Sequence, residues 1–270
     1  MKRKLQNIIN KCYAVVAVGI LILLWQGICS FHIVPEFMLP SPVQVVKAFV
    51  GDFPLLLFHA KTSLVEAFLG LFLGVCIGFI VAVLMDRYEW IHRALYPIIV
   101  LTQTIPTVAI APLLVLWLGY EMAPKIVLII LVTFFPIAVG VFNGFQSSDK
   151  DTIQLLRSMG AKKRQIFWHV KLPSCLGDFF SSLRISVSYA IVGAVIAEWL
   201  GGVSGLGVYM TRVRKSFAFD KMFAVIFLIS LISLLLIGAV NCLQRFCMPW
   251  ERKTQESLLS KTKDRKEEGK

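Results

Sequence analysis

The chain offers few groups that could carry out covalent chemistry. Its six cysteines are scattered along or beside apolar runs, none forms a CxxC pair, and four histidines are too few to complete a metal cluster. The sequence contains no GxxxxGKS/T phosphate-binding loop, no HExxH and no GxSxG. Paired carboxylates inside apolar runs are also not evident. We therefore expect no catalytic residue, no metal site and no nucleotide bound by the chain itself.

The composition predicts a membrane protein. Of the 270 residues 57% are hydrophobic, and the mean hydropathy is +0.75. A soluble domain of this length cannot bury so much apolar side chain, and several apolar runs exceed the roughly 18 residues that mark a transmembrane helix. We predict an all-α polytopic protein with a membrane domain over 12–243 and about six spans, at residues 12–31, 63–85, 94–118, 125–143, 179–200 and 222–243.

The basic residues predict the orientation. With the N-terminus inside, the segments 1–11, 86–93, 143–178 and 244–270 hold 20 Lys and Arg residues, against 7 in the outside segments. Both termini are therefore predicted to be cytoplasmic, with a frayed, disordered tail at 244–270. The net charge of +12 follows this topology. Because no basic groove with interleaved aromatics is visible, nucleic-acid binding is not expected.

Two spans carry polar residues that could line a pathway. The third span contains three prolines together with Gln103, Thr104, Pro106 and Thr107. Interior prolines delete backbone hydrogen bonds, and such breaks are tolerated where the backbone lines protein or a water-filled cavity. This span is predicted to be a bent helix that either lines a pathway or only assists packing.

The fifth span places a carboxylate within the membrane. Arg184 and Glu198 have 13 residues between them, so they lie ~21 Å apart on a helix, less than the ~30 Å hydrocarbon core. Since a charge in the membrane costs about 3 kcal/mol, Glu198 should face the bundle interior or a cavity. It either lines a pathway or serves a structural or gating role near the outer interface.

Two amphipathic segments lie outside the spans. In the first outside loop, 31–62, Val43, Val46, Phe49 and Val50 form one apolar face, which predicts a helix lying on the outer membrane surface. The second segment is 149–173, on the cytoplasmic side. Ser148 should cap its first helix, Gly160 should end it in the left-handed conformation, and Pro173 should end a second helix. This elbow either docks on a partner or lies on anionic lipid.

The elbow resembles the EAA coupling loop of type I ABC importer permeases. That pattern reads EAA, three residues, Gly, nine residues, Ile, one residue and Leu-Pro; here Gly160, Val170, Leu172 and Pro173 match, while Gln154-Leu155-Leu156 replaces EAA. The stretches QTIPTVAIAPLLVLWLGY, FFPIAVG and AEWLGGVSGLG are similar to the nitrate, sulfonate and taurine branch. The resemblance covers roughly residues 35–245.

The resemblance implies partners. An ATP-binding cassette subunit would bind ATP and Mg and receive the elbow, an extracytoplasmic binding protein would deliver substrate, and a second permease copy would complete the pathway in the plasma membrane. The residues implied to couple to the ATPase are Gln154, Leu156, Arg157, Met159, Gly160, Ala161, Ile166, Leu172 and Pro173, with Lys162–Arg164 as a polar rim.

The substrate class rests on the resemblance as well. LLRSMGA and SFAFDKMFAVI look most like permeases for thiamine-precursor pyrimidines of the hydroxymethylpyrimidine type. Pathway side chains that suit a small polar heterocycle are Gln103, Thr104, Ser186, Ser188 and Tyr189. The alternatives are an importer of sulfonate, nitrate or riboflavin in the same family, a secondary carrier without an ATPase, and a membrane scaffold.

Overall fold

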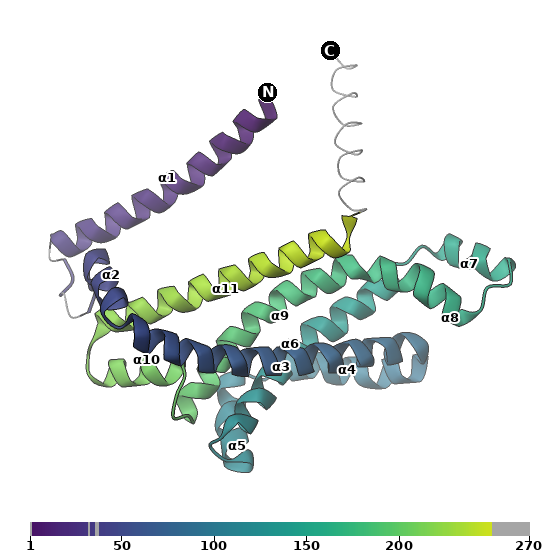
Figure 1. Ribbon diagram of the computed structural model, residues 1–270. Coiled ribbons are helices and arrows are strands. Elements are labelled where there is room, and N and C mark those ends of the chain that lie inside the picture. Colours follow the sequence, from purple (N-terminus) through teal and green to yellow (C-terminus); the bar gives the residue numbers. More distant parts are fainter. Residues whose placement is uncertain (1, 32, 36–37, 250–270) are drawn as a thin grey trace.

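The computed structural model describes residues 2–31, 33–35 and 38–249, which are helical apart from short connections (Figure 1). The helices are α1 (Lys2–Ser30), α2 (Pro42–Gly51), α3 (Phe53–Arg87), α4 (Glu89–Thr104), α5 (Thr107–Leu118), α6 (Met122–Gln146), α7 (Lys150–Ser158), α8 (Lys163–Ile166), the π-helical turn η1 (Phe167–Lys171), α9 (Leu172–Leu200), α10 (Leu206–Lys215) and α11 (Phe219–Cys247). The predicted all-α class is confirmed.

The centre of the bundle is made by α3, α6 and α9, which pack on one another along most of their length. A Cβ atom on Gly78 of α3 would lie 2.9 Å from the carbonyl oxygen of Phe134 in α6, and one on Gly70 would lie 2.5 Å from the Ile129 side chain. Backbones approach this closely only where the contact residues are small. Small residues therefore recur along this face of α3, at Gly70, Gly74, Gly78 and Ala82.

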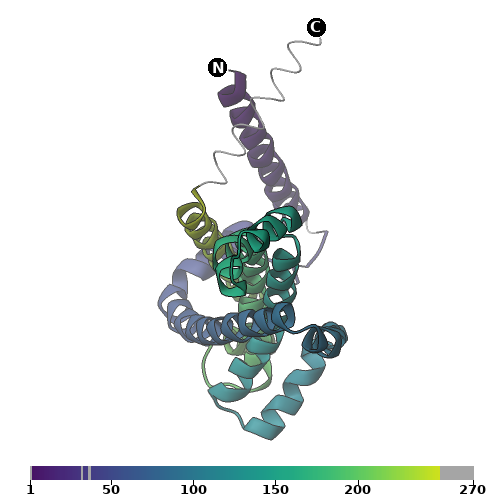
Figure 2. The same ribbon diagram turned by 90° about the vertical axis from the view of Figure 1, so that its right-hand side faces the viewer.

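The predicted count of about six spans is not confirmed. Within the described residues, four helical segments are long and apolar enough to cross a membrane: Phe53–Arg87, Met122–Gln146, Lys163–Leu200 and Phe219–Cys247. The bent pair α4 and α5 counts as a fifth if it is one span. Helix α1 contains the apolar helical stretch Val16–Ser30, counted over the residues whose side chains the structure describes. Helix α1 lies to one side of the bundle (Figure 2).

Two of the three segments predicted to lie outside contain more helix than predicted. The expected surface helix is α2, which begins at a Ser41–Gln44 capping box, but α3 already starts at Phe53 and occupies the rest of that loop. The segment 201–221 contains α10, which was not predicted. Its buried side chains Leu206, Tyr209, Met210 and Val213 follow a helical period. That spacing is visible in the sequence and could have revealed the helix. From residue 250 on, the predicted tail lies outside the described residues.

A buried polar network joins α3, α9 and the start of α10. The Glu198 carboxylate is 2% exposed; it accepts hydrogen bonds from the Ser63 hydroxyl and the Gly207 backbone N–H, both at 2.6 Å. The Leu206 N–H donates to the Ser63 hydroxyl oxygen at 2.8 Å. A Cβ on Gly205 (φ +130°) would lie 2.2 Å from the Glu198 carboxyl carbon, so the loop requires glycine there. Glu198 thus fixes the fold of residues 205–207.

A second buried carboxylate lies beside the first. Glu66 in α3 pairs with Lys125 in α6, with 2.6 Å between Lys125 Nζ and Glu66 Oε1, and both side chains are almost fully buried. The Glu66 and Glu198 charges interact electrostatically. The sequence interpretation was therefore wrong in two respects: it placed Lys125 with the outside loop cations, and it found no pair of carboxylates within the apolar runs. Lys125 lies in the first turn of α6, where packing against α3 removes it from water.

Asp52, just before α3, ties the same end of the bundle to α10 and α11. Its carboxylate accepts hydrogen bonds from Tyr209 and from Lys221, whose Nζ lies 2.8 Å away. The Lys221 hydrogen bond, together with that from Tyr209, holds the pKa of Asp52 below its usual value. Burial, reinforced by the Asp52 hydrogen bond, raises the pKa of Tyr209. Asp52 is therefore ionised and Tyr209 neutral at physiological pH.

We predict that Lys125→Met lowers the free energy of unfolding by about 3–5 kcal/mol, because it leaves the buried Glu66 carboxyl without its only charged partner among the described residues. The double variant Lys125→Met/Glu66→Met should recover most of the loss, since it removes both charges. Thermal unfolding of the purified protein in detergent measures both effects.

The matched control is Arg93→Met, which breaks the exposed Glu89–Arg93 pair. An exposed pair contributes only about 0–1 kcal/mol, so this variant should unfold close to the parent. Equal stability of Lys125→Met and Arg93→Met would contradict the compensating role of Lys125.

Candidate functional site

A cavity of about 470 Å³ lies between the broken α4–α5 pair and the helices α6 and α9. Gln103, Ile105, Pro106 and Thr107 line it from the break, and Tyr189 lines it from α9. The remaining lining residues are Thr102, Ile110, Leu128, Leu131, Val132, Val192, Gly193 and Ile196. A volume of this size is within the range of pockets for small molecules.

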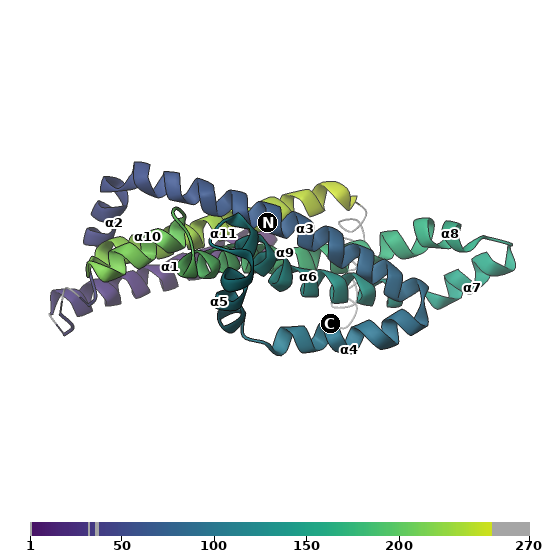
Figure 3. The ribbon, with the colours of Figure 1, turned by 90° about the horizontal axis from the view of Figure 1, so that it is seen from below.

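The break between α4 and α5 creates one wall of this cavity. The two helices meet at 99°, and Figure 3 shows the chain turning sharply between them. Ile105 is extended (φ −81°, ψ 121°) because the following proline disfavours the helical region for it. Pro106 then serves as the N-cap of α5. The bend predicted from the prolines is present, and it is a complete interruption rather than a kink within one helix.

The structure brings four of the predicted pathway residues together around the cavity: Gln103, Pro106, Thr107 and Tyr189. The other four, Thr104, Ser186, Ser188 and Glu198, do not line it. The Thr104 hydroxyl donates to the Leu101 carbonyl at 2.8 Å, and the buried Ser186 hydroxyl donates to the Thr133 carbonyl at 3.1 Å. The Ser188 hydroxyl donates to the Arg184 carbonyl at 3.3 Å, and Glu198 is held in the buried network described above. These four side chains are bonded within the protein.

The lining of the cavity is uncharged. Its polar groups are the amide of Gln103, the hydroxyls of Thr102, Thr107 and Tyr189, and backbone groups at the break. The Gln103 side chain makes no hydrogen bond or ion pair with another described residue. An amide that can donate and accept, beside an aromatic ring, suits a small polar heterocycle better than an anion.

The elbow projects from the bundle at the end opposite α10 (Figure 1). Its first helix, α7, is capped by Asp149, whose carboxylate accepts hydrogen bonds from the Asp151 and Thr152 N–H groups. The hydrogen bond from the Thr152 hydroxyl to Asp149 is the largest cause that lowers the pKa of this carboxyl. The cap is therefore Asp149 and not Ser148, because the carboxylate lies in reach of two free N–H groups.

Gly160 ends the elbow's first helix as predicted, with φ +84°. Pro173 does not end the second one. The chain instead passes through α8 and the π-helical turn η1 into α9 without interruption. Pro173 lies in the first turn of α9, where its missing N–H and fixed φ cost little.

The elbow residues implied to contact a partner fall into two groups. Gln154, Arg157, Met159, Gly160 and Pro173 are exposed, with Met159 75% exposed. Leu156, Ala161 and Leu172 are half-buried, and Ile166 is only 4% exposed. Ile166 therefore packs inside the elbow, whereas Met159 and its neighbours remain free to contact another protein.

Elbow and cavity are connected by a single helix. Helix α9 begins directly after η1 and supplies Tyr189, Val192, Gly193 and Ile196 to the cavity. The 17 steps from Leu172 to Tyr189 span ~26 Å at the rise of an α-helix. The elbow and one wall of the cavity therefore belong to one continuous helical segment.

The known proteins to which this chain is similar are membrane components of transport systems. The family model for the binding-protein-dependent transport system inner membrane component matches residues 74–252. The formylaminopyrimidine transport permease protein ThiX of Halalkalibacterium halodurans is 38% identical over 234 residues, covering 86% of this chain and 93% of that protein. The taurine transport system permease protein TauC of Escherichia coli is 30% identical and covers 88% of this chain and 89% of its own.

Solved structures show the same fold. The MetNI methionine ABC transporter in an inward-facing conformation has a chain that aligns with a TM-score of 0.62 at 21% identity, covering 72% of this chain and 97% of that one. An amino acid ABC transporter with histidines aligns at a TM-score of 0.58. The chain therefore belongs to the binding-protein-dependent transport system inner membrane component family: it is the permease subunit of an ABC importer, an integral plasma-membrane protein that works with a separate ATPase subunit and a substrate-binding protein.

Proposed function

We propose that this permease imports a small uncharged heterocycle, a pyrimidine precursor of thiamine. The observation that carries the proposal is the uncharged lining of the 470 Å³ cavity, where the Gln103 amide and the Tyr189 ring are the main polar and aromatic groups. The similarity to a formylaminopyrimidine permease supports the same class. A pyrimidine presents ring nitrogens and an amino group to an amide and a flat face to a tyrosine.

The alternatives within the family fit this lining less well. Taurine carries a sulfonate, and a buried anion requires paired charges or several hydrogen-bond donors, whereas no Lys or Arg lines the cavity. The riboflavin permease RibX of Chloroflexus aurantiacus is 30% identical over 238 residues, but its substrate is a tricyclic flavin with a sugar-alcohol chain. A one-ring heterocycle is the better match in size.

In the proposed mechanism, the pathway alternates between two orientations in a homodimer of this chain, with both termini and the elbow in the cytoplasm. ATP and Mg bind to the partner subunit, whose closure draws the two elbows together, and α9 passes this motion to the cavity. Two apolar side chains on α5, Leu116 and Trp117, are exposed. Such a surface supports a second permease copy as the opposite wall of the pathway.

The proposed function is tested by uptake of a radiolabelled formylaminopyrimidine into vesicles that contain this chain, its neighbouring ATPase and its binding protein. We expect uptake that requires ATP and that excess unlabelled pyrimidine abolishes, while excess taurine has no effect. ATP-driven uptake of taurine alone would overturn the substrate, and uptake that is indifferent to ATP would overturn the mechanism.

A second prediction concerns the elbow turn. In Gly160→Val a β-branched residue must adopt φ +84°, although no atom lies close enough to clash with its Cβ. The strain of about 1–2 kcal/mol favours another turn conformation by about 5- to 30-fold. Substrate transported per ATP hydrolysed should therefore fall, while the protein still folds and assembles.

Gly177→Val is the matched control, because Gly177 also has free space around its Cβ but lies within α9. The ratio of transport to hydrolysis in this variant should remain at the parent value. A parental ratio in Gly160→Val would show that the shape of the turn does not matter for coupling.

A further inference from the structure

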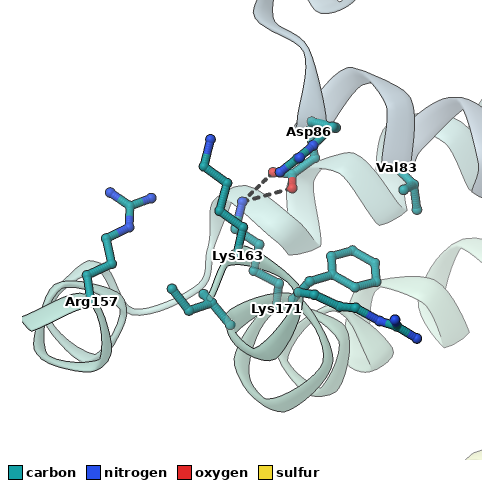
Figure 4. Close-up of a pocket in the computed structure, with 9 residues that line it drawn as sticks. Val83, Asp86, Arg157, Lys163 and Lys171 are labelled. Carbon is teal, nitrogen blue, oxygen red and sulfur yellow. Dashed lines mark hydrogen bonds and ion pairs between the residues drawn. The ribbon is translucent and has the colours of Figure 1, made fainter. Parts of the chain in front are cut away.

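A second cavity, of about 440 Å³, lies between the end of α3 and the elbow (Figure 4). Val83, Asp86 and Arg87 line it from α3, and Arg157 lines it from α7. The elbow's second part supplies the remaining lining residues Lys163, Arg164, Ile166, Phe167 and Lys171. The cavity therefore has five cationic side chains and one carboxylate.

One of the five cations is neutralised within the protein. Lys171 Nζ lies 2.6 Å from Asp86 Oδ1 and 2.8 Å from Oδ2 (Figure 4). The other four, Arg87, Arg157, Lys163 and Arg164, form no side-chain hydrogen bond or ion pair with any described residue. Four unpaired positive charges around one cavity repel one another, and an anion held among them would relieve that repulsion.

The four unpaired cationic side chains are hydrogen-bond donors that suit a phosphate group. Three of the four unpaired cations are arginines, whose planar guanidinium groups bind phosphate oxygens through two parallel hydrogen bonds. Lys163 adds a compact charge of the kind that also contacts phosphate. In Figure 4 the Arg157 and Lys163 side chains extend from the elbow on the same side as the Asp86–Lys171 pair. All of these side chains line the one cavity.

The position of the cavity indicates where that phosphate comes from. Arg87 is the last residue of the membrane-spanning helix α3, so the cavity lies at the level where lipid headgroups begin. Trp90 and Trp168, which are close in the chain to the lining residues Arg87 and Phe167, are exposed, as is typical of aromatic side chains at a membrane–water interface. Val83, Ile166 and Phe167 give the cavity an apolar side, against which the start of an acyl chain can lie.

We propose that this cavity binds the phosphate headgroup of an acidic membrane phospholipid. Basic pockets between membrane helices at the headgroup level bind such lipids by charge and hydrogen bonding. Because the cavity joins α3 to both halves of the elbow, a bound headgroup would fasten the elbow to the bundle. The lipid would then hold the elbow in the orientation in which it meets its partner.

The test measures lipid retention by the full chain assembled with its ATP-binding partner, in nanodiscs of phosphatidylcholine with added phosphatidylglycerol. Native mass spectrometry counts the phosphatidylglycerol that stays bound. Arg87→Gln/Arg164→Gln removes two of the unpaired cations and should weaken retention by about tenfold or more. The matched control Lys162→Gln removes an elbow cation that does not line the cavity, and it should retain the lipid as the parent does.

A second variant removes the one negative charge of the cavity lining instead of two positive charges. Asp86→Asn frees Lys171 and should strengthen phosphatidylglycerol retention, a gain that misfolding would not produce. Equal retention by the parent, the double variant and Asp86→Asn would overturn the proposal.

Two further outcomes would also overturn it. If inorganic phosphate binds in lipid-free detergent with the same dependence on Arg87 and Arg164, while phosphatidylglycerol is not retained, the site takes a soluble phosphate and not a lipid. The isolated chain could also retain the lipid and lose it when the ATPase binds. If Arg87→Gln/Arg164→Gln then weakens binding of the ATPase itself, the cations bind acidic side chains of the ATPase and not a lipid.

Discussion

The fold depends on how two carboxylates are kept inside a membrane bundle. Hydrocarbon offers no water to a charged group, so Glu66 and Glu198 must be compensated by protein. Lys125 pairs with Glu66 at 2.6 Å, and Ser63 and the Gly207 N–H bind Glu198 at 2.6 Å. These contacts fix the relative positions of α3, α6, α9 and the segment 205–207 at one end of the molecule.

The remaining helices differ in how extensively they pack on the centre of the bundle. Helices α3, α6 and α9 pack through small residues, and α9 runs unbroken from the elbow to the cavity. The α4–α5 pair packs less extensively and is interrupted at Ile105-Pro106. The cavity therefore has one wall on a continuous helix and another on an interrupted one. A change in the position of α9 alters the distance between these walls.

The local features of the fold could be predicted from the sequence where one residue type decides the backbone. Gly160 adopts the left-handed conformation, and the prolines near Gln103 break the third span, because sterics alone determine these conformations. The predictions failed where tertiary packing decides. Pro173 looked like a stop but lies in the first turn of α9 after a π-helical turn, and Lys125 looked like a loop cation but pairs with Glu66 across two helices. Sequence spacing does not reveal a partner that is 59 residues away.

We infer that ATP acts on the elbow and thereby opens or closes the cavity. The rate of thiol labelling at Thr107→Cys tests it directly, in a cysteine-free background assembled with the ATPase in vesicles. Thr107 lines the cavity, and Tyr120→Cys, exposed outside it, serves as the reference. The account predicts that ATP changes the labelling rate at position 107 several-fold and leaves position 120 unchanged. Equal labelling at position 107 with and without ATP would contradict it.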